Sequence, residues 1–355
     1  MNNLWNLARF LLLVMVSLLL ISCETVQFYG QAVRGQLSIL TSRQDIEQLI
    51  SAPDTDPVLV RKLELVLQAR EFANTELLLP AGDSFTSYSD VDRQHVVWNV
   101  FAAPEFSLSP VNWCYPVAGC VAYRGYFSES GAIRFARNLE SEGFDVYVGG
   151  VDAYSTLGWF ADPLLSTVMN RDDAQLAGLV FHELAHQKLY VPGDTTFNES
   201  FATLVEREGV ARWLQATGVV EDREVEAQAN RQEEFVALVL SFRERFEALY
   251  ESGADEERMR QAKASLQSEL RGQYGQLKLA WGGYPGYDNW FSAELNNAQL
   301  STVNSYNDLV PAMRTLLENM AGSLPEWFDE MQRLAGLPRD ERDAFFDSVQ
   351  VANMR

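Results

Sequence analysis

The chain has 355 residues, of which 47% are hydrophobic and 22% charged, so it can bury a sizeable core in one large domain or two smaller ones. This apolar content excludes a disordered chain, and the 22 glycines and 12 prolines exclude a collagen-like or low-complexity one. The formal net charge is −21, with 49 acidic against 28 basic residues. That balance argues against a phosphate-binding surface, and hence against nucleic acid as a partner.

The first 23 residues predict export to the bacterial cell envelope. A single Arg9 precedes an apolar run over 10–21, which is too short to span a bilayer of about 30 Å and is typical of a signal peptide. The motif LISC that ends at Cys23 resembles the lipobox of bacterial lipoproteins. We therefore expect a signal peptide over 1–22 and a lipid anchor on Cys23, with the outer membrane (periplasmic face) as the destination. An uncleaved N-terminal anchor is the alternative.

Two further cysteines, Cys114 and Cys120, remain once Cys23 is assigned to the lipid. In an oxidising compartment this pair predicts a disulfide that closes the loop 115–119. Two buried free thiols are the alternative.

The first part of the mature chain mixes helical and strand patterns. Apolar residues at helical spacing alternate with β-branched and aromatic runs, and Asp56-Pro57 is typical of a helix start. The predicted elements are, in chain order, helices over 28–50 and 56–74, strands over 95–101 and within 117–127, a helix over 129–142 and a strand over 144–154.

The second part predicts almost only helices. They cover 171–190, 198–216, 222–252 and 255–279, followed by a mostly helical tail over 293–349. Gly253 and Asp255 mark a turn between the two longest helices, which predicts an antiparallel hairpin. The expected fold class is therefore α+β and helix-rich.

One motif carries specific chemistry, His182-Glu183-Leu184-Ala185-His186. Residues four apart share a helix face, so both imidazoles can reach one metal ion, with Glu183 beside them to hold a water molecule. The chain has only 3 histidines, which makes a chance occurrence of this pattern rare. The third, His95, lies in an apolar run, and we expect it to be structural.

A zinc site needs a third protein ligand, and Glu199 is the candidate. The segment 191–196 between it and His186 is rich in turn formers and can reverse the chain. Asn198 is expected to cap the next helix, which puts Glu199 in the first turn, either facing the imidazoles or simply stabilising the helix dipole. Glu206 lies on the same face and either accepts an imidazole N–H or is a solvated charge.

Asn198-Glu199-Ser200-Phe201-Ala202 resembles the block that carries the third zinc ligand in gluzincin aminopeptidases, although the spacing from His186 is shorter. The chain is more similar to a bacterial family of predicted zinc aminopeptidases, most of them lipoproteins. The segments that carry this resemblance are 113–127, 151–168, 181–190, 193–209 and 296–313. The resemblance implies a zincin-like metallopeptidase core, in which a small sheet with an edge strand packs on the metal-binding helix.

On this basis we divide the chain into three parts. The signal peptide covers 1–22, and the N-terminal helices with the catalytic core cover 23–218. A helical domain over 219–355, which contains the hairpin 222–279, is expected to close the cleft.

The expected mechanism is zinc-dependent hydrolysis with Glu183 as general base. A tyrosine hydroxyl is expected to stabilise the oxyanion, and Tyr306 is our candidate because it lies in the resembling segment 296–313. The alternatives are Tyr154, Tyr190, Tyr284 and Tyr287.

The strand over 144–151 precedes the metal-binding helix, as the substrate-binding edge strand does in zincin folds. We expect an extended peptide to add to it, with Gly149 and Gly150 allowing close backbone approach and Tyr154 contacting the substrate. An aminopeptidase also needs a carboxylate for the substrate amine. By position alone the candidates are Asp152, Asp194 and Glu294.

The leading hypothesis is thus a lipid-anchored zinc aminopeptidase of the bacterial envelope, with peptides as its substrates. A zinc endopeptidase of envelope proteins is the nearest alternative. A non-catalytic binding or assembly lipoprotein on the same fold is the alternative from another class.

Overall fold

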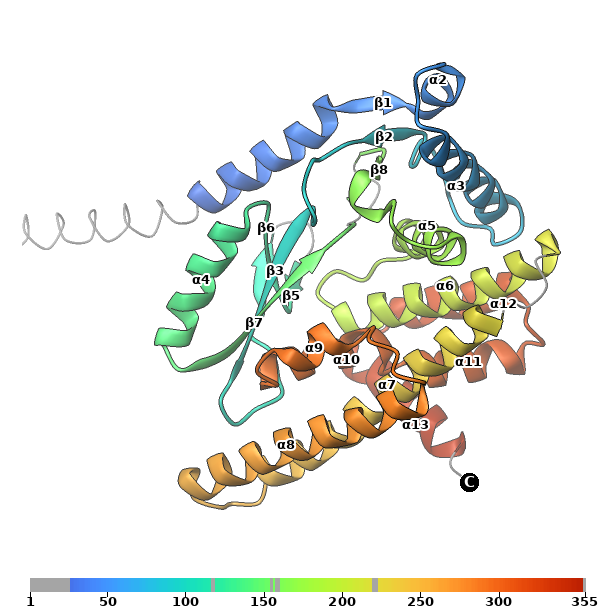
Figure 1. Ribbon diagram of the computed structural model, residues 1–355. Helices are drawn as coiled ribbons and strands as arrows, with labels where there is room; N and C mark the ends of the chain where they lie inside the picture. The colour runs from blue at the N-terminus through green and yellow to red at the C-terminus, as the bar shows by residue number, and fades with distance from the viewer. Residues whose placement is uncertain (1–25, 116–118, 154–155, 157–159, 219–222, 354–355) are drawn as a thin grey trace, which may run out of the picture.

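The computed structural model of the chain describes residues 26–115, 119–153, 156, 160–218 and 223–353 (Figure 1). Cys23 and Tyr154 therefore lie outside the described residues, as does the signal peptide expected over 1–22. Within the described part, no helix is both long enough and apolar enough to cross a membrane.

The first half of the chain mixes helices and strands, as expected. It opens with a helix over 26–41. The elements that follow are β1 (Arg43–Asp45), α2 (Ile46–Ser51), α3 (Pro57–Thr75), β2 (Ser87–Ser89), β3 (Val97–Pro104), β4 (Trp113–Tyr115), β5 (Gly119–Val121), β6 (Arg124–Tyr126), α4 (Glu129–Ser141), β7 (Phe144–Val151), β8 (Leu164–Leu165) and the 3₁₀ turn Ser166–Val168. The single helix predicted over 28–50 is wrong, because Asp45 caps a new helix by accepting a hydrogen bond from the Gln48 N–H.

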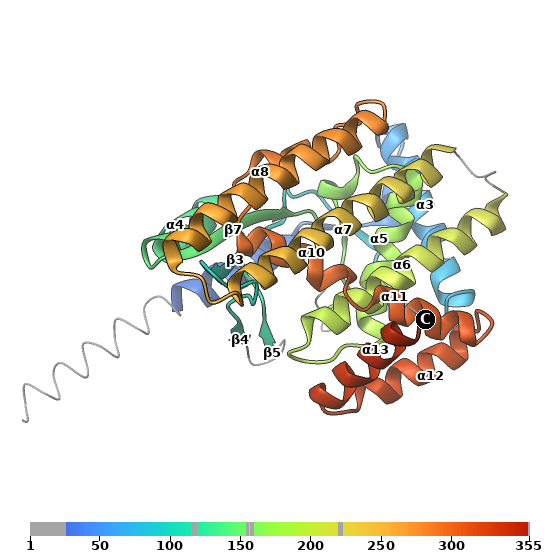
Figure 2. The same cartoon turned by 90° about the horizontal axis from the view of Figure 1, so that it is seen from below.

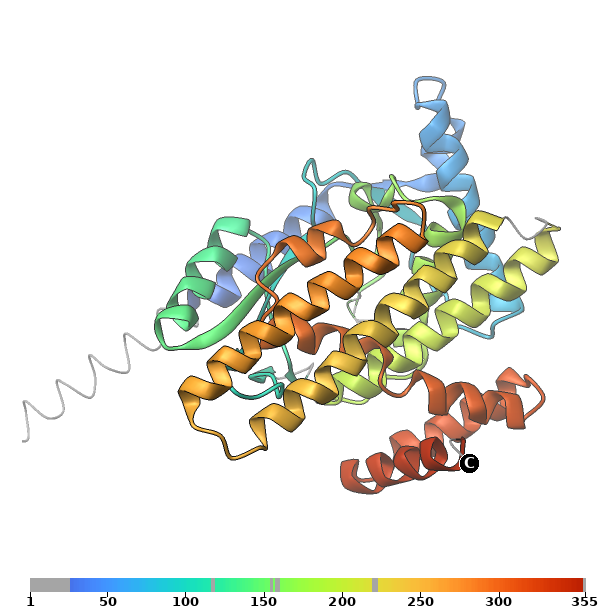
Figure 3. The same cartoon turned by 60° about the horizontal axis from the view of Figure 1, so that its bottom comes forward.

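The second half consists of helices. They are α5 (Asp173–Lys188), α6 (Thr195–Thr217), α7 (Arg223–Tyr250), α8 (Glu256–Ala280), α9 (Asp288–Ser292), α10 (Asn297–Asn307), α11 (Val310–Asn319), α12 (Leu324–Ala335) and α13 (Arg339–Asn353). α7 and α8 lie side by side as the predicted hairpin (Figures 2 and 3). The helix-rich α+β class is therefore confirmed.

The main sheet has the strand order β6-β3-β7 and is antiparallel. β3 pairs with β7 along its whole length, from Val97 opposite Val151 to Pro104 opposite Phe144, so β7 is an edge strand among the described residues. α4 covers one face of this sheet, where Ala132 and Ala136 pack on apolar side chains of β3 and β6. α5 packs chiefly on α3 and α6, so the sheet makes less direct contact with that helix than expected.

A short hairpin formed by β4 and β5 carries the two remaining cysteines. Cys114 lies directly opposite Cys120 in the strand register, and a disulfide joins them. The first residue of β5 contacts the segment before α6, because a Cβ on Gly119 would lie 2.6 Å from the backbone nitrogen of Gly193. The hairpin is therefore in contact with the loop that leads into the helix of Glu199.

The largest apolar core is formed by α3, α5, α6 and the last three helices. Phe181, Phe201 and Trp327 are fully buried there. A second core lies inside the hairpin, where Phe242 of α7 and Leu270 of α8 pack against residues of α9 and α10. Each long helix is thus held by an apolar stripe that it buries.

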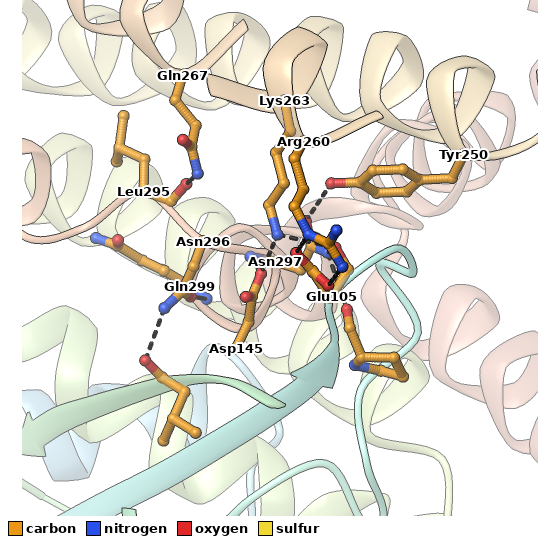
Figure 4. A network of polar contacts seen from close by, with 12 residues as sticks. Glu105, Asp145, Tyr250, Arg260, Lys263, Gln267, Leu295, Asn296, Asn297 and Gln299 are labelled. Carbon is orange, nitrogen blue, oxygen red and sulfur yellow. Dashed lines mark hydrogen bonds and ion pairs between the residues drawn. The ribbon is translucent and has the colours of Figure 1, made fainter. Parts of the chain in front are cut away.

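A buried polar network attaches this hairpin to the sheet (Figure 4). Lys263 of α8 donates to Asp145 of β7 at 2.6 Å and to the Glu105 carbonyl at 2.8 Å. Asn297, at the start of α10, donates its backbone N–H to the same Asp145 carboxylate and its side-chain amide to the Glu105 carbonyl. The charge of Lys263 is thus paired and hydrogen-bonded, as a buried cation requires.

The crossing of α5 and α6 depends on glycine. A Cβ on Gly209 would lie 2.7 Å from Cδ2 of Phe181 and 2.8 Å from Cδ1 of Leu77, both in the core. Gly209→Ala is therefore expected to lower the free energy of unfolding by about 1–3 kcal/mol through overpacking. Gly275→Ala in α8, where a Cβ meets nothing within 4 Å, is expected to stabilise by up to about 1 kcal/mol. Urea unfolding measures both, and equal effects would contradict the packing argument.

Candidate metal centre

α5 carries the two histidines of the motif on its inner side. The helix starts at a capping box, in which Asp172 accepts from the Gln175 N–H and the Gln175 side chain accepts from the Asp172 N–H. His182 and His186 follow one turn apart, with ring centroids 4.9 Å from each other. Their neighbours Phe181 and Ala185 are fully buried, which fixes the rotation of the helix and directs both imidazoles to one place.

α6 supplies the third side chain, although it begins earlier than expected. Its cap is Asp194, which accepts from the Phe197 N–H, and not Asn198. Asn198 instead bonds through its side chain to the N–H and carbonyl of Val191 and so holds the preceding turn. Glu199 consequently lies in the second turn of α6, beyond the first-turn position in which an acid stabilises a helix dipole.

Glu199 faces both imidazoles in the structure. Its Oε2 lies 3.5 Å from His182 Nε2 and 3.6 Å from His186 Nε2. Ligand atoms bound to one tetrahedral ion at about 2.0–2.2 Å are about 3.3–3.6 Å apart. The potential ligand atoms of the three residues all lie within 4.8 Å of one another, so this group could hold a metal ion.

An orphaned polar atom at the same place supports that fit. Among the described residues, Glu183 Oε2 is buried without a hydrogen-bond partner. Buried polar atoms are normally bonded, and an exception calls for an explanation such as an ion or a water molecule. Two imidazoles and one carboxylate, with a further carboxylate beside them, form a donor set that suits catalytic zinc.

Glu206 contacts the first histidine from the opposite side. Its Oε2 lies 3.0 Å from His182 Nδ1, which leaves Nε2 of the same ring to face Glu199. The approach of α6 to α5 at this point depends on Gly178, where a Cβ would lie 3.2 Å from Cγ of Glu206. A carboxylate on the far nitrogen fixes the orientation and tautomer of a ligating imidazole.

Glu206→Gln is expected to weaken metal binding by about 10–100-fold, because an amide orients the imidazole less firmly and does not raise its basicity. Competition with a chromophoric chelator measures this. Glu71→Gln, an exposed substitution on α3, serves as the control. Unchanged affinity in the Glu206 variant would show that this carboxylate is only a surface charge.

The electrostatics of the cluster follow from burial and mutual charge. Burial would lower the pKa of His182, but its bonds to Glu199 and Glu206 raise that pKa well above its usual value. Burial would likewise raise the pKa of Glu199, yet the two imidazoles hold it at about 2. For Glu183 burial dominates and its pKa is raised, as suits a group that exchanges protons.

Two tyrosines lie close enough to feel these charges. Tyr123, between β5 and β6, has its pKa raised first by burial and then by the charge of Glu199. The pKa of Tyr190 is raised by the same two effects. The centroid of the Tyr123 ring lies 5.6 Å from that of Phe101 on β3, so Tyr123 lies between the sheet and the helices α5 and α6. The sequence-based prediction missed Tyr123, although it lies in the resembling segment 113–127.

The other candidate tyrosines differ in their surroundings. Tyr306 belongs to α10, but its side chain is outside the described part of the chain. Tyr287 donates to Gln232 at 2.6 Å and stacks on Phe235. The guanidinium carbon of Arg231 lies 4.1 Å from the centroid of the Tyr284 ring. Tyr284 and Tyr287 are therefore engaged in an aromatic cluster with other partners.

Gly149 and Gly150 lie in β7 as expected, and a specific neighbour explains the second. A Cβ on Gly150 would come within 2.5 Å of the ring of His95. His95 in turn contacts Asp152, with Nδ1 2.6 Å from Oδ1. This agrees with a structural histidine, and Gly150 makes room for it.

The carboxylates considered for the substrate amine are mostly engaged. Asp152 contacts His95 and lies 3.8 Å from Arg171. Asp194 is buried, caps α6 and is paired with Arg342, so it is unsuited to that task. Glu294 is exposed. Sequence position alone could not separate these cases, because the partners come from distant segments.

A comparison with known proteins finds a family match that includes the segments described above. A protein-family model described as "Putative aminopeptidase" (Aminopep) matches residues 27–346. No curated protein and no solved structure matches the chain. The matched range includes the disulfide hairpin, the edge strand β7, the helices α5 and α6 of the candidate metal centre and the α7–α8 hairpin.

Proposed function

The chain belongs to the family described as "Putative aminopeptidase", and from this premise we propose that it is a zinc-dependent peptidase that releases N-terminal residues from peptides at the bacterial cell envelope. The observation that carries the proposal is the convergence of His182, His186 and Glu199 within 4.8 Å. Glu183 lies beside them with one buried, unpartnered oxygen among the described residues. Three ligands for a metal ion and one proton acceptor beside them are the minimum that metal-assisted hydrolysis requires.

The proposed roles follow from these positions. A zinc ion bound there supplies Lewis acidity, which polarises a carbonyl and lowers the pKa of water. Glu183 takes a proton from the attacking water at its free oxygen and gives it to the leaving amine as the C–N bond breaks. Glu206 keeps the His182 ring in place through Nδ1.

The free edge of β7 is the proposed binding strand for an extended substrate. Asn296 donates to the Val146 carbonyl at 2.8 Å from outside the sheet (Figure 4), so the backbone groups of Val146 point to this edge. Alternate residues point the same way, which assigns Val148 and Gly150 to the free edge as well. Since Asn296 already bonds the Val146 carbonyl, a peptide would add along the second half of β7.

For the oxyanion we propose the Tyr123 hydroxyl as a donor beside the earlier candidate Tyr306. Among the described residues it has no hydrogen-bond partner. Tyr123→Phe is expected to lower kcat by about 10²–10³-fold with little change in KM, because the lost bond forms with the developing charge. Tyr287→Phe, which removes a hydroxyl bonded to Gln232, is the control. A Tyr123→Phe enzyme with normal kcat would leave the role to another residue.

The remaining expectations enter as parts of this proposal. They are a signal peptide over 1–22, a lipid on Cys23, an outer-membrane location, a zincin-like core over 23–218 and a helical domain over 219–355. The antiparallel sheet backed by α4, with an edge strand before the metal helices, supports the zincin-like core.

Peptide cleavage tests the proposal directly. The full chain in detergent, zinc-loaded or stripped of metal, is incubated with a mixed peptide library, and mass spectrometry locates the broken bonds. Zinc-dependent, stepwise loss of N-terminal residues is expected. Internal cuts would indicate an endopeptidase. Zinc binding without any cleavage would contradict the enzyme and favour a binding or assembly role.

A further inference from the structure

The helix over 26–41 exposes an apolar stripe to solvent. Its members are Val26, Tyr29, Val33 and Leu37, with exposed fractions of 67%, 42%, 57% and 53%. They recur at intervals of three and four residues and therefore share one face of the helix. The opposite face carries Ile39, which is 2% exposed, so the stripe points away from the protein body.

Such a stripe is unusual on this molecule. The described residues include nine large hydrophobic side chains that are exposed, and four of them form this stripe. A fifth, Ile133, lies on α4, which occupies the same end of the molecule (Figures 1 and 3). Single exposed apolar residues are ordinary, whereas a contiguous set marks a surface that another phase or partner covers.

The charges around the stripe differ from those of the whole chain. The helix contains no acidic residue and one basic residue, Arg34, although the net charge of the protein is −21. Arg134 and Arg137 of α4 line a groove of about 470 Å³ beside this helix. None of these three arginines pairs with a carboxylate of a described residue. Exposed, unpaired arginines beside an apolar stripe suit an anionic lipid surface.

The chain outside the described residues points to the same partner. The lipid proposed on Cys23 would be attached three residues before Val26, so an anchored chain would start this helix close to the bilayer. We propose that the apolar stripe lies in the interface of an anionic phospholipid bilayer, with Arg34, Arg134 and Arg137 near the lipid phosphates. This surface fixes the orientation of the protein body and does not depend on the peptidase proposal.

A fluorescent reporter tests the placement. The chain from residue 24 onward, which lacks the apolar run and the lipid, receives Val33→Cys and is labelled there with an environment-sensitive nitrobenzoxadiazole dye, since Cys114 and Cys120 are joined. The matched control carries Leu279→Cys, an apolar position of α8 that is 71% exposed. Both proteins are mixed with vesicles of phosphatidylethanolamine and phosphatidylglycerol, and circular dichroism checks that each is folded.

A blue shift and a severalfold rise in emission at position 33, with no change at position 279, is the expected result. Arg134→Gln/Arg137→Gln is expected to reduce the shift at position 33 on these vesicles. An unchanged spectrum at position 33, or equal shifts at both positions, would overturn the proposal. A shift at position 33 that grows with protein concentration without vesicles would overturn it in favour of a second copy of the chain.

Discussion

Glu183→Gln is expected to lower kcat for peptide hydrolysis by about 10²–10⁴-fold, the usual contribution of a general base. Glutamine keeps the shape of the side chain but does not accept the proton of the attacking water. Burial raises the pKa of Glu183, which brings this pKa closer to the operating pH and so suits the carboxyl to proton transfer. Steady-state kinetics on a peptide that the wild type cleaves provide the measurement.

Metal content separates a catalytic effect from a structural one. Because Glu183 is not among the three grouped ligands, the variant should retain bound zinc. Glu64→Gln, at an exposed position of α3, is the matched control and should behave as the wild type. A Glu183 variant with normal turnover would remove this residue from the mechanism, and one without zinc would make it a ligand.

Arg342→Met is expected to lower the free energy of unfolding by about 3–5 kcal/mol, because it leaves a buried carboxylate without its partner. Arg342 is 2% and Asp194 4% exposed. The guanidinium bonds to Asp194 and, at 3.0 Å, to the Leu337 carbonyl. This pair ties α13 to the first residue before α6, and therefore to the helix that carries Glu199.

Urea unfolding measures the loss, with Arg339→Met as the control. Arg339 lies on the same helix but is 61% exposed and 3.6 Å from Asp343, so its removal should cost less than about 1 kcal/mol. Adding Asp194→Asn to Arg342→Met should restore part of the stability, since the unpaired charge is then gone. Equal effects of the two arginine substitutions would contradict the buried-pair argument.

Local signals were sufficient for several parts of this fold. Asp56 accepts from the N–H groups of Val58 and Leu59, so α3 begins where an acid followed by proline predicts it. The long hairpin likewise follows from apolar spacing and the turn at Gly253. The four-residue spacing of His182 and His186 is by itself sufficient to place both imidazoles on one face of a helix.

The failures have a common physical origin in contacts between distant segments. Asn198 is of a type that often caps helices, but its side-chain amide bonds the backbone of Val191 instead. Asp194 caps α6 and is paired with Arg342. Tyr123 has no periodicity or motif of its own. Only the packing of the β4–β5 hairpin near the start of α6 brings it to the candidate metal centre.

The glycine contacts between α5 and α6 bear on the thermodynamics of the metal site. Gly178 and Gly209 leave room for side chains of the facing helix, Glu206 and Phe181 respectively, and Phe181 is fully buried in the core beneath them. The distances among the three candidate ligands are therefore set by helix packing that exists before any ion arrives. An ion would therefore bind with little reorganisation of the protein. Little of the free energy of the metal–ligand bonds would be used to order the site, so most of it would contribute to the observed affinity.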